Sequence, residues 1–453
     1  MVTGHPAGDD PGDRLRWPGV VVVGAGVTGL LVTEELTRRG VPVLLVEQSR
    51  LGAGQTGHCH GYLHRGYIYR GITASRRQAL ERCADWWARR LAPAGDAVVG
   101  TRSVIGFTSD TEREEALAAW KSLDMPWEDV DAPGLAGTAG TFAVPEASVS
   151  PRAAMRAVAG TAARVPTLHG RATAVRHSGG SVRSVDVLTG EGTVTVSAPA
   201  FVLSAGLGTP GLLGPLARTL GVRTRLTYML VCRTGQDLPE AFCLPADSAQ
   251  GLFVASRPAG RERVYLMSTF VNFWASDEDE AARRSWLGAA SRVLAHHLPG
   301  LWADPATRWG LYPACKVEVD APDQAGGGLP EGGVFDLGWD NALTVLPGKL
   351  VLAPLFAEEC LNRLGRLTDL DRLREASPPG GSPAASSPPG PFTTGSGPSS
   401  GPSPAPGGSV ASPWAAEDWE MTPLFTRAEL FDHPTPHHVP AAPHGKDNDR
   451  WSA

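Results

Sequence analysis

Long apolar runs are absent from this sequence of 453 residues. No stretch of 18 apolar residues occurs in it, so the sequence predicts no transmembrane helix. Residues 1–17 contain acids, glycines and prolines instead of a basic region followed by an apolar run, so no secretory signal is indicated. The six cysteines form no CxxC pair and no metal-ligand spacing, a pattern typical of reduced intracellular proteins. We therefore expect a soluble, cytoplasmic protein that binds neither a metal nor a membrane.

A strong excess of either charge is also absent. The formal net charge is −6, which gives no general attraction to nucleic acid. Hydrophobic residues make up 42% and charged residues 19% of the chain, as in an ordinary globular protein. A chain of this length can bury one large core or two ordinary ones. Composition therefore indicates a globular protein and excludes nucleic acid as an expected partner.

The most informative stretch is a glycine-rich turn between two apolar segments. Val20–Val23 predicts a short buried strand, and the sequence GAGVTG at 24–29 leads into a helix that ends at Gly40. A second buried strand follows at 41–46 and is closed by Glu47. Strand, glycines, helix, strand and acid in this order predict a βαβ unit that binds a dinucleotide. The motif alone does not choose between NAD and FAD, and an ordinary βαβ crossover is the alternative.

The glycines and the acid of that unit have separate physical tasks. Gly24 permits the tight turn, Gly26 lets the backbone approach a pyrophosphate, and Gly29 lets helix and strand pack closely. Backbone N–H groups at the start of the helix, at Val27 and Thr28, face the phosphates. The acid at the end of the second strand can accept hydrogen bonds from ribose hydroxyls.

Residues 48–72 follow that acid as a loop in which glycines and three histidines alternate with tyrosines. The pattern Gln55-Thr56-Gly57-His58, then Gly61, His64 and Tyr67 to Tyr69, resembles the D-amino acid oxidase superfamily of FAD-dependent oxidoreductases. That superfamily includes glycine and sarcosine oxidases, dimethylglycine dehydrogenase and L-2-hydroxyglutarate dehydrogenase, and the pattern is most similar to the hydroxyglutarate branch. The resemblance implies that Gln48, Thr56, His58 and Gly61 contact the cofactor.

The histidines of this loop have two assigned roles. In relatives with T-x-H at this place the histidine lies beside the flavin ring, and in the dimethylglycine dehydrogenase type it is the covalent attachment point, so a covalent link would fall on His58. Position alone supports such a link, and we expect non-covalent FAD. Imidazole titrates near neutrality and can accept the proton released as a hydride leaves the substrate, which makes His64 the candidate base. Any one of these histidines could instead only cap a turn.

A strand-rich block at 165–209 predicts a β-meander that ends in an apolar strand and the turn Ala205-Gly206. This turn resembles the second flavoprotein signature, in which the chain passes beside the pyrophosphate, and it favours FAD over NAD. The resemblance also implies a backbone contact to adenine near the start of the meander, where Ala172 is the nearest counterpart. An ordinary βα turn is the alternative interpretation.

Short alternating strands at 222–275 predict an antiparallel sheet. In this superfamily such a sheet forms the substrate domain, and relatives then re-enter the FAD domain with an Arg or Lys near the substrate carboxylate. Lys316 is the candidate for that cation, with a surface lysine as the alternative.

A strand, the turn Pro347-Gly348 and a helix are predicted at 338–359. In this superfamily such an element lies at the pyrimidine end of the flavin, where a helix N-terminus or a lysine stabilises negative charge on the reduced ring. Gly348, Lys349 and Leu350 are therefore candidate cofactor contacts. The alternative is a plain strand-turn-helix that closes the fold.

Residues 377–412 contain 10 Pro, 8 Gly and 10 Ser, a composition that predicts disorder. The sequence as a whole predicts an α/β protein with a Rossmann-like FAD-binding domain, built on a parallel sheet and interleaved with an antiparallel-sheet substrate domain. The expected boundaries are a disordered N-terminus at 1–17, the FAD-binding domain at 18–97, 145–215 and 330–375, the substrate domain at 98–144 and 216–329, a linker at 376–412, and a tail at 413–453 with a short docking segment.

The resemblance implies an FAD-dependent oxidoreductase that removes a hydride from the C–N bond of an amine or amino acid, with flavin N5 as acceptor. Oxidation of a 2-hydroxy acid at C–O is the rival, and the Gly348-Lys349-Leu350 element, which departs from the hydroxyglutarate branch, ranks it second. A third hypothesis is an FAD-binding scaffold without turnover. Expected partners are a small substrate bearing a carboxylate, oxygen or another electron acceptor, and a protein partner for the C-terminal tail.

Overall fold

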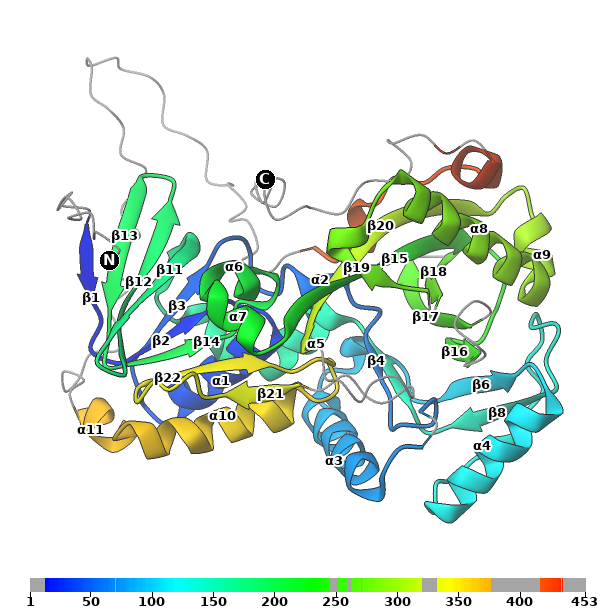
Figure 1. Cartoon of the computed structure of the whole chain (residues 1–453). Helices are drawn as coiled ribbons and strands as arrows, with labels where there is room; N and C mark the ends of the chain where they lie inside the picture. The colour runs from blue at the N-terminus through cyan, green and yellow to red at the C-terminus, as the bar shows by residue number, and fades with distance from the viewer. Residues whose placement is uncertain are drawn as a thin grey trace, which may run out of the picture.

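The computed structural model describes residues 13–69, 71–244, 251–259, 262–269, 271–319, 332–375, 416–432 and 434. The predicted linker at 376–412 therefore lies outside the described residues. The elements form two groups, one around a parallel sheet and one around a larger, mainly antiparallel sheet (Figure 1). No helix within these ranges is both long and apolar enough to cross a membrane.

The first group is built on a six-stranded sheet with the order β10-β3-β2-β14-β22-β21. Every neighbouring pair is parallel except β21 with β22. The strands are β2 (Val20–Val23), β3 (Val43–Glu47), β10 (Thr167–His169), β14 (Ala200–Leu203), β21 (Gly333–Phe335) and β22 (Ala342–Leu346).

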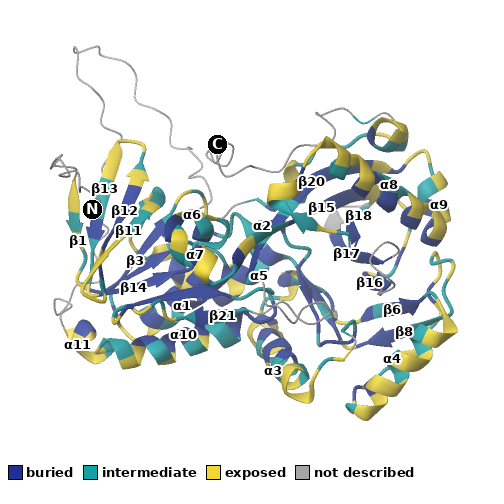
Figure 2. Cartoon of the chain, viewed as in Figure 1, coloured by how far each residue is buried: buried dark blue, intermediate teal, exposed yellow. Residues whose placement is uncertain are grey.

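Both faces of this sheet are covered, which explains why its strands are apolar throughout. Val20 and Val22 point to one face and pack with helices α1 (Val27–Arg38), α3 (Ala74–Leu91), α5 (Pro151–Val158) and α10 (Ala353–Leu367). Val21 and Val23 point to the other face and pack against a four-stranded sheet. The order of that sheet is β1 (Arg14–Arg16), β13 (Gly192–Ser197), β12 (Ser181–Thr189) and β11 (Arg171–Ser178). Figure 2 shows these strands as buried, whereas the outer face of α10 is exposed.

The expected unstructured N-terminus is wrong at residues 14–16. These residues form β1, which pairs in parallel with β13 from Arg14 opposite Thr195 to Arg16 opposite Ser197. The physical reason is that β13 ends the meander with one unpaired edge, and an additional strand satisfies its backbone groups.

The second group is built on a nine-stranded sheet with the order β19-β15-β18-β17-β16-β6-β8-β7, to which β20 is added beside β15. All of its pairings are antiparallel except β16 with β6. The strands are β6 (Ser103–Phe107), β7 (Glu128–Asp129), β8 (Gly140–Val144), β15 (Val222–Thr234), β16 (Ala241–Leu244), β17 (Leu252–Ala259), β18 (Glu262–Thr269), β19 (Phe273–Trp274) and β20 (Arg308–Val319).

Helix α8 (Glu280–His297) covers one face of this sheet, where Trp286 and Leu294 pack against Tyr228 and Leu230. A three-stranded sheet of β4 (Tyr62–Leu63), β9 (Ala147–Val149) and β5 (Val98–Gly100) lies where the chain passes between the two groups. The remaining helical elements are α2 (Gln55–His58), η1 (Gly95–Ala97), α4 (Asp110–Ser122), η2 (Gly160–Arg164), η3 (Gly206–Gly208), α6 (Thr209–Leu213), α7 (Pro215–Thr219), η4 (Ala275–Asp277), α9 (Pro299–Ala303) and α11 (Leu370–Glu375).

The C-terminal segment, residues 416–432, begins on the opposite face of the nine-stranded sheet and ends on the α8 face, where Leu430 and Phe431 pack. It contains α12 (Asp418–Met421) and η6 (Ala428–Asp432). Trp419 and Leu424 pack against Met229, Val231 and Tyr312, and Phe425 forms an isolated antiparallel bridge with Trp309. The C-terminal segment is thereby placed against strands β15 and β20 of the nine-stranded sheet.

Candidate active site

Two glycines of the predicted dinucleotide turn have opposite surroundings. At Gly29, an added Cβ would lie 1.9 Å from the carbonyl oxygen of Gly24 and 2.6 Å from Ser204 Oγ. At Gly26, the N-cap of α1, an added Cβ would meet only Thr56 Oγ1, at 3.5 Å. Gly29 is therefore required for packing, while Gly26 leaves an open face at the helix N-terminus where a phosphate group can lie. Gly24 makes the turn itself, with a φ of +96°.

Three separate segments converge on that helix N-terminus. The Val27 N–H donates to Thr56 Oγ1 at 2.9 Å, which ties α1 to the loop after Glu47. Gly206, which follows Ala205 after β14, has a φ of +52°, and an added Cβ would lie 3.1 Å from Gln55 Oε1. The hydroxyl of Thr28 is buried and has no hydrogen-bond partner among the described residues. These observations fit a pyrophosphate cradle, because such a group needs close backbone approach and additional donors.

Glu47 ends β3 beside this cradle. Its Oε2 accepts the Ala25 N–H at 2.7 Å and its Oε1 accepts the Ser49 N–H at 2.9 Å. Burial raises the pKa of the carboxyl group, and these N–H donors oppose that change. Each carboxylate oxygen has a further lone pair for a ribose hydroxyl. Gln48, the next residue, is exposed, and Ala172 lies on β11, which packs against β3.

His58 and Gly61 lie in the loop that starts with α2. His58 is buried, and burial lowers its pKa to about 4. Its Nε2 lies 3.1 Å from Asp418 Oδ2, and its carbonyl oxygen accepts the Tyr312 hydroxyl at 3.1 Å. At Gly61 the φ is +72°, and an added Cβ would lie 2.0 Å from the carbonyl oxygen of Val149. The loop is therefore held from both groups of elements.

His64 lies in a buried cluster with an aromatic and a cationic neighbour. Its Nε2 is 3.3 Å from the Tyr69 hydroxyl, and Lys349 Nζ lies 5.7 Å from the centre of the Tyr69 ring. Burial, followed by the charge of Lys349, lowers the pKa of His64 well below its usual value. Burial also lowers the pKa of His60 to about 3. Both imidazoles are therefore neutral at physiological pH.

Lys316 belongs to an ionic group on the same side of the sheet. Its Nζ lies 2.5 Å from Glu318 Oε1, and Arg225 Nε lies 2.7 Å from Glu318 Oε2. The Lys316 side chain is one-third exposed, whereas Glu318 is buried. Burial and the charge of Lys349 lower the pKa of Lys316 to about 8. The buried carboxylate of Glu318 pairs with both Lys316 and Arg225, so this group carries a net positive charge.

The turn before α10 places the second lysine. Gly348 has a φ of +64°, and α10 begins at Ala353. Burial lowers the pKa of Lys349, and the nearby Glu318 opposes that change. Leu350 packs into the core on the helical face of the parallel sheet. The predicted cofactor contacts in this turn therefore differ: Lys349 points toward Tyr69, while the side chain of Leu350 serves the core.

Several polar residues near the site were not among the predicted ones. Glu146 is fully buried and accepts the Tyr62 hydroxyl at 2.8 Å and the backbone N–H groups of Arg65 and Gly66. Arg257 donates to the carbonyl of His60 at 2.8 Å and pairs with Glu417. Nothing local in the sequence marks Arg257 or Glu417, because their partners are distant in the chain.

A family model described as FAD dependent oxidoreductase (DAO) matches residues 19–348. The chain belongs to this family. The expected FAD cofactor and the expected mixed α/β fold are thereby confirmed. This chain is 26% identical, over 374 residues, to a probable FAD-dependent oxidoreductase of Pseudomonas aeruginosa. The match covers 76% of this chain and 90% of the relative.

Two further comparisons involve proteins with named substrates. The crystal structure of glycine oxidase from Geobacillus kaustophilus has a TM-score of 0.60 and 17% identity, covering 78% of this chain and 95% of that one. At this identity the likeness shows the fold alone. An anaerobic glycerol-3-phosphate dehydrogenase subunit A1 of Haloferax volcanii is 31% identical over 191 residues, which is 39% of this chain and 32% of the relative.

Proposed function

We propose that this oxidoreductase removes a hydride from a carbon that bears an amine, in an amine or amino acid that carries a carboxylate. The observation that supports this proposal is the cluster in which Lys316 and Lys349 surround the buried, neutral His60 and His64. Such a cluster attracts an anionic substrate, and each neutral imidazole keeps one ring nitrogen without a proton. When bound, FAD supplies the hydride acceptor at its flavin N5.

The residues of the chain have separate roles in this proposal. Glu47 binds ribose hydroxyls, and the glycine turn with Thr56 and the Ala205-Gly206 turn holds the pyrophosphate. Lys316 binds the substrate carboxylate, and Lys349 stabilises negative charge at the pyrimidine end of the ring. His64 Nε2 accepts the proton that leaves the substrate as its hydride is removed.

Oxidation of a hydroxy acid at C–O is the second candidate. Two observations favour it: a buried neutral imidazole can take a hydroxyl proton, and one partial relative carries the name glycerol-3-phosphate dehydrogenase. The chain covers only 32% of that relative, so the amine remains our first proposal.

Anaerobic bleaching of the flavin across a panel of amino acids, N-methyl amino acids and 2-hydroxy acids tests these candidates. We expect bleaching by members of the amine classes, and imine hydrolysis then yields a carbonyl product together with ammonia or methylamine. Bleaching by hydroxy acids only would establish the second candidate. Bound FAD that no compound reduces would contradict both and favour the scaffold hypothesis.

The same panel of compounds tests the roles proposed for His64 and Lys316. His64→Gln keeps a hydrogen-bonding side chain without a base, and we expect the reduction rate to fall by about 10²–10⁴. Lys316→Met removes the proposed carboxylate partner while Arg225 still pairs with the buried Glu318. We therefore expect a higher substrate Kd, with a smaller change for an amine that lacks a carboxylate. Equal losses for both kinds of amine would contradict the role of Lys316.

Covalent attachment at His58 is tested by acid precipitation. We expect the yellow colour to remain in the supernatant, because a non-covalent flavin is released when the protein unfolds. Colour in the pellet that disappears in His58→Ala would instead establish a covalent histidyl link.

A further inference from the structure

The C-terminal segment brings two acidic side chains into the proposed flavin site. Glu417 is 3% exposed and the side chain of Asp418 is 12% exposed. A small cavity lies between Ala416 and Glu417 on one side and Thr56 and Gly57 on the other. These contacts connect residues separated by more than 350 positions in the sequence.

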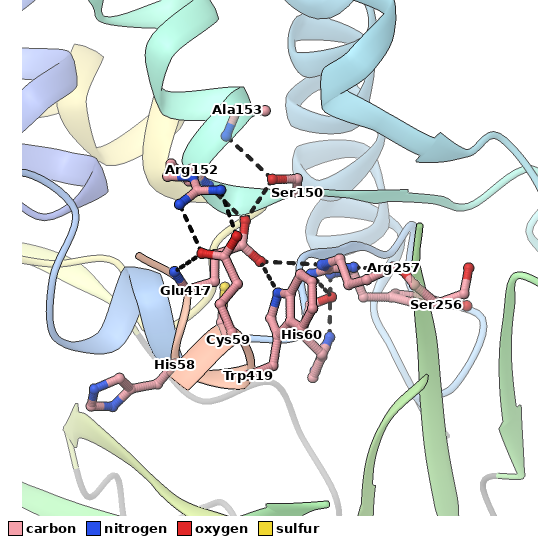
Figure 3. A network of polar contacts seen from close by, with 12 residues as sticks. His58, Cys59, His60, Ser150, Arg152, Ala153, Ser256, Arg257, Glu417 and Trp419 are labelled. Carbon is pink, nitrogen blue, oxygen red and sulfur yellow. Dashed lines mark hydrogen bonds and ion pairs between the residues drawn. The ribbon is translucent and has the colours of Figure 1, made fainter. Parts of the chain in front are cut away.

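Glu417 is the centre of a polar network (Figure 3). Its Oε1 accepts the Ser150 hydroxyl at 2.5 Å and the Arg152 N–H at 3.2 Å, both at the start of α5. Its Oε2 accepts the Trp419 Nε1–H at 2.9 Å and the Arg257 Nε–H at 3.2 Å. Burial acts to raise the pKa of Glu417, but these donors outweigh it, so that the pKa is lowered. Glu417 is therefore ionised in the network.

Arg257 transmits this contact to the flavin-facing loop. Its side chain is 1% exposed, and its Nη2 donates to the carbonyl oxygen of His60 at 2.8 Å. The same Nη2 would be 2.9 Å from a Cβ added to Gly61. The guanidinium thus lies directly on the backbone of the loop, with Glu417 as its buried counter-ion.

Asp418, the next residue in the chain, contacts a different part of the same loop. Its Oδ2 lies 3.1 Å from Nε2 of His58, whose side chain points away from the Glu417 network in Figure 3. Burial, followed by the charge of Glu417, raises the pKa of Asp418 to about 7, and its carboxyl group lies directly against the imidazole ring. Two adjacent residues therefore restrain two different parts of the loop, its backbone at His60 and its side chain at His58.

Docking of the segment does not by itself require these charges. Leu430 is fully buried, and Phe431 packs edge-on against Trp302 and Trp309, so apolar contacts already hold the segment. A buried ion pair is commonly no more stabilising than apolar residues of similar volume. The acidic pair therefore needs an explanation other than attachment of the segment.

We propose that residues 416–421 complete the flavin site, with Glu417 and Asp418 as positioning residues that hold the His58–Gly61 loop against the cofactor. The proposal rests on the proposed function to the extent that this loop faces the flavin. It assigns to the C-terminal segment a role in cofactor binding.

Glu417→Gln and Asp418→Asn in the full chain test this role, because each replaces a carboxyl group by an amide of the same shape. We expect Glu417→Gln to raise the FAD Kd about tenfold, which corresponds to about 1.4 kcal/mol. We expect Asp418→Asn to change the visible circular dichroism of bound FAD, because the imidazole beside the ring loses its orientation. Glu420→Gln is the matched control. Glu420 lies on the same short helix, α12, and pairs with Arg152 of α5, but it is partly exposed and does not reach the loop.

The outcomes separate positioning from a merely structural role. FAD affinity and visible circular dichroism equal to those of the unmodified protein in both variants would overturn the proposal, even if the Tm fell. If Glu417→Gln did not fold, Asp418→Asn would decide, with an unchanged flavin spectrum counting against the proposal. Failure of the proposed function is a different result: FAD bound normally by the unmodified protein but reduced by no amine.

Discussion

At the scale of single residues, Gly26 and Gly29 show that one motif can contain two kinds of constraint. Gly29 faces protein atoms that leave no room for a methyl group, whereas Gly26 faces open space apart from Thr56 Oγ1. The first is a constraint of folding and the second a constraint of cofactor binding.

We therefore predict different results for the two alanine variants. Gly29→Ala should destabilise the FAD-free protein by about 1–3 kcal/mol, because the methyl group overlaps the Gly24 carbonyl. Gly26→Ala should leave its unfolding free energy within about 0.5 kcal/mol but raise the FAD Kd at least about tenfold, or about 1.4 kcal/mol. Urea unfolding without FAD and a fluorescence titration with FAD measure the two effects. Equal destabilisation by both variants would contradict the distinction.

Glu146 is a second residue with a specific prediction. Burial raises its pKa to about 6, although the Tyr62 hydroxyl and backbone N–H groups oppose the change. The folded protein then binds more protons than the unfolded chain, whose Glu pKa is about 4.3. Stability from this group is complete below about pH 4 and is lost as pH rises to about 6, a total of about 2 kcal/mol.

Glu146→Gln should remove this pH dependence, because an amide can still accept the backbone N–H groups but does not titrate. Urea unfolding of both proteins between about pH 4 and pH 7 measures it. We expect the unmodified protein to lose about 2 kcal/mol more than the variant over that interval. Parallel stability curves would show that Glu146 does not titrate in this range.

At the scale of elements, the buried pair of Arg257 and Glu417 connects β17 to the helix α12. Each side chain is almost fully buried, so removal of one leaves an uncompensated charge. The pair therefore makes the position of the C-terminal segment depend on a strand of the antiparallel sheet.

A double-mutant cycle should reveal this dependence. Glu417→Ala and Arg257→Met should each cost about 3–5 kcal/mol of unfolding free energy, while the double variant should cost clearly less than their sum. Urea unfolding of the four proteins supplies the coupling energy. Additive losses would mean that the two charges are stabilised independently.

At the scale of the whole molecule, the proposed ribose, pyrophosphate and flavin contacts come from four segments: 24–29, 47–61, 205–206 and 348–350. FAD at about 100 times its Kd should stabilise the folded protein by about 2.7 kcal/mol. Hydrogen exchange should slow in all four segments together, because one ligand restrains them at once. Protection limited to residues 24–29 would contradict a cofactor that contacts all four segments.

Local sequence determined much of this architecture. The valines of β2 and the glycines that follow specify a strand and a tight turn through short-range sterics and burial, so the βαβ unit could be predicted before any contact was known. Pro347-Gly348 and the helix at α10 were predictable for the same reason. The strand at 14–16 was not, because its reason for forming is the free edge of β13, far along the chain.

The sequence by itself thus determined the family, the cofactor and the βαβ unit, since each depends on residues close together in the chain. Only the tertiary structure decided which charged side chains meet. Lys316, Lys349 and His64 come from three distant segments, and Glu417 and Asp418 reach the loop at His58–Gly61 from the other end of the chain. Such contacts depend on how sheets and helices pack, and no local spacing encodes that packing.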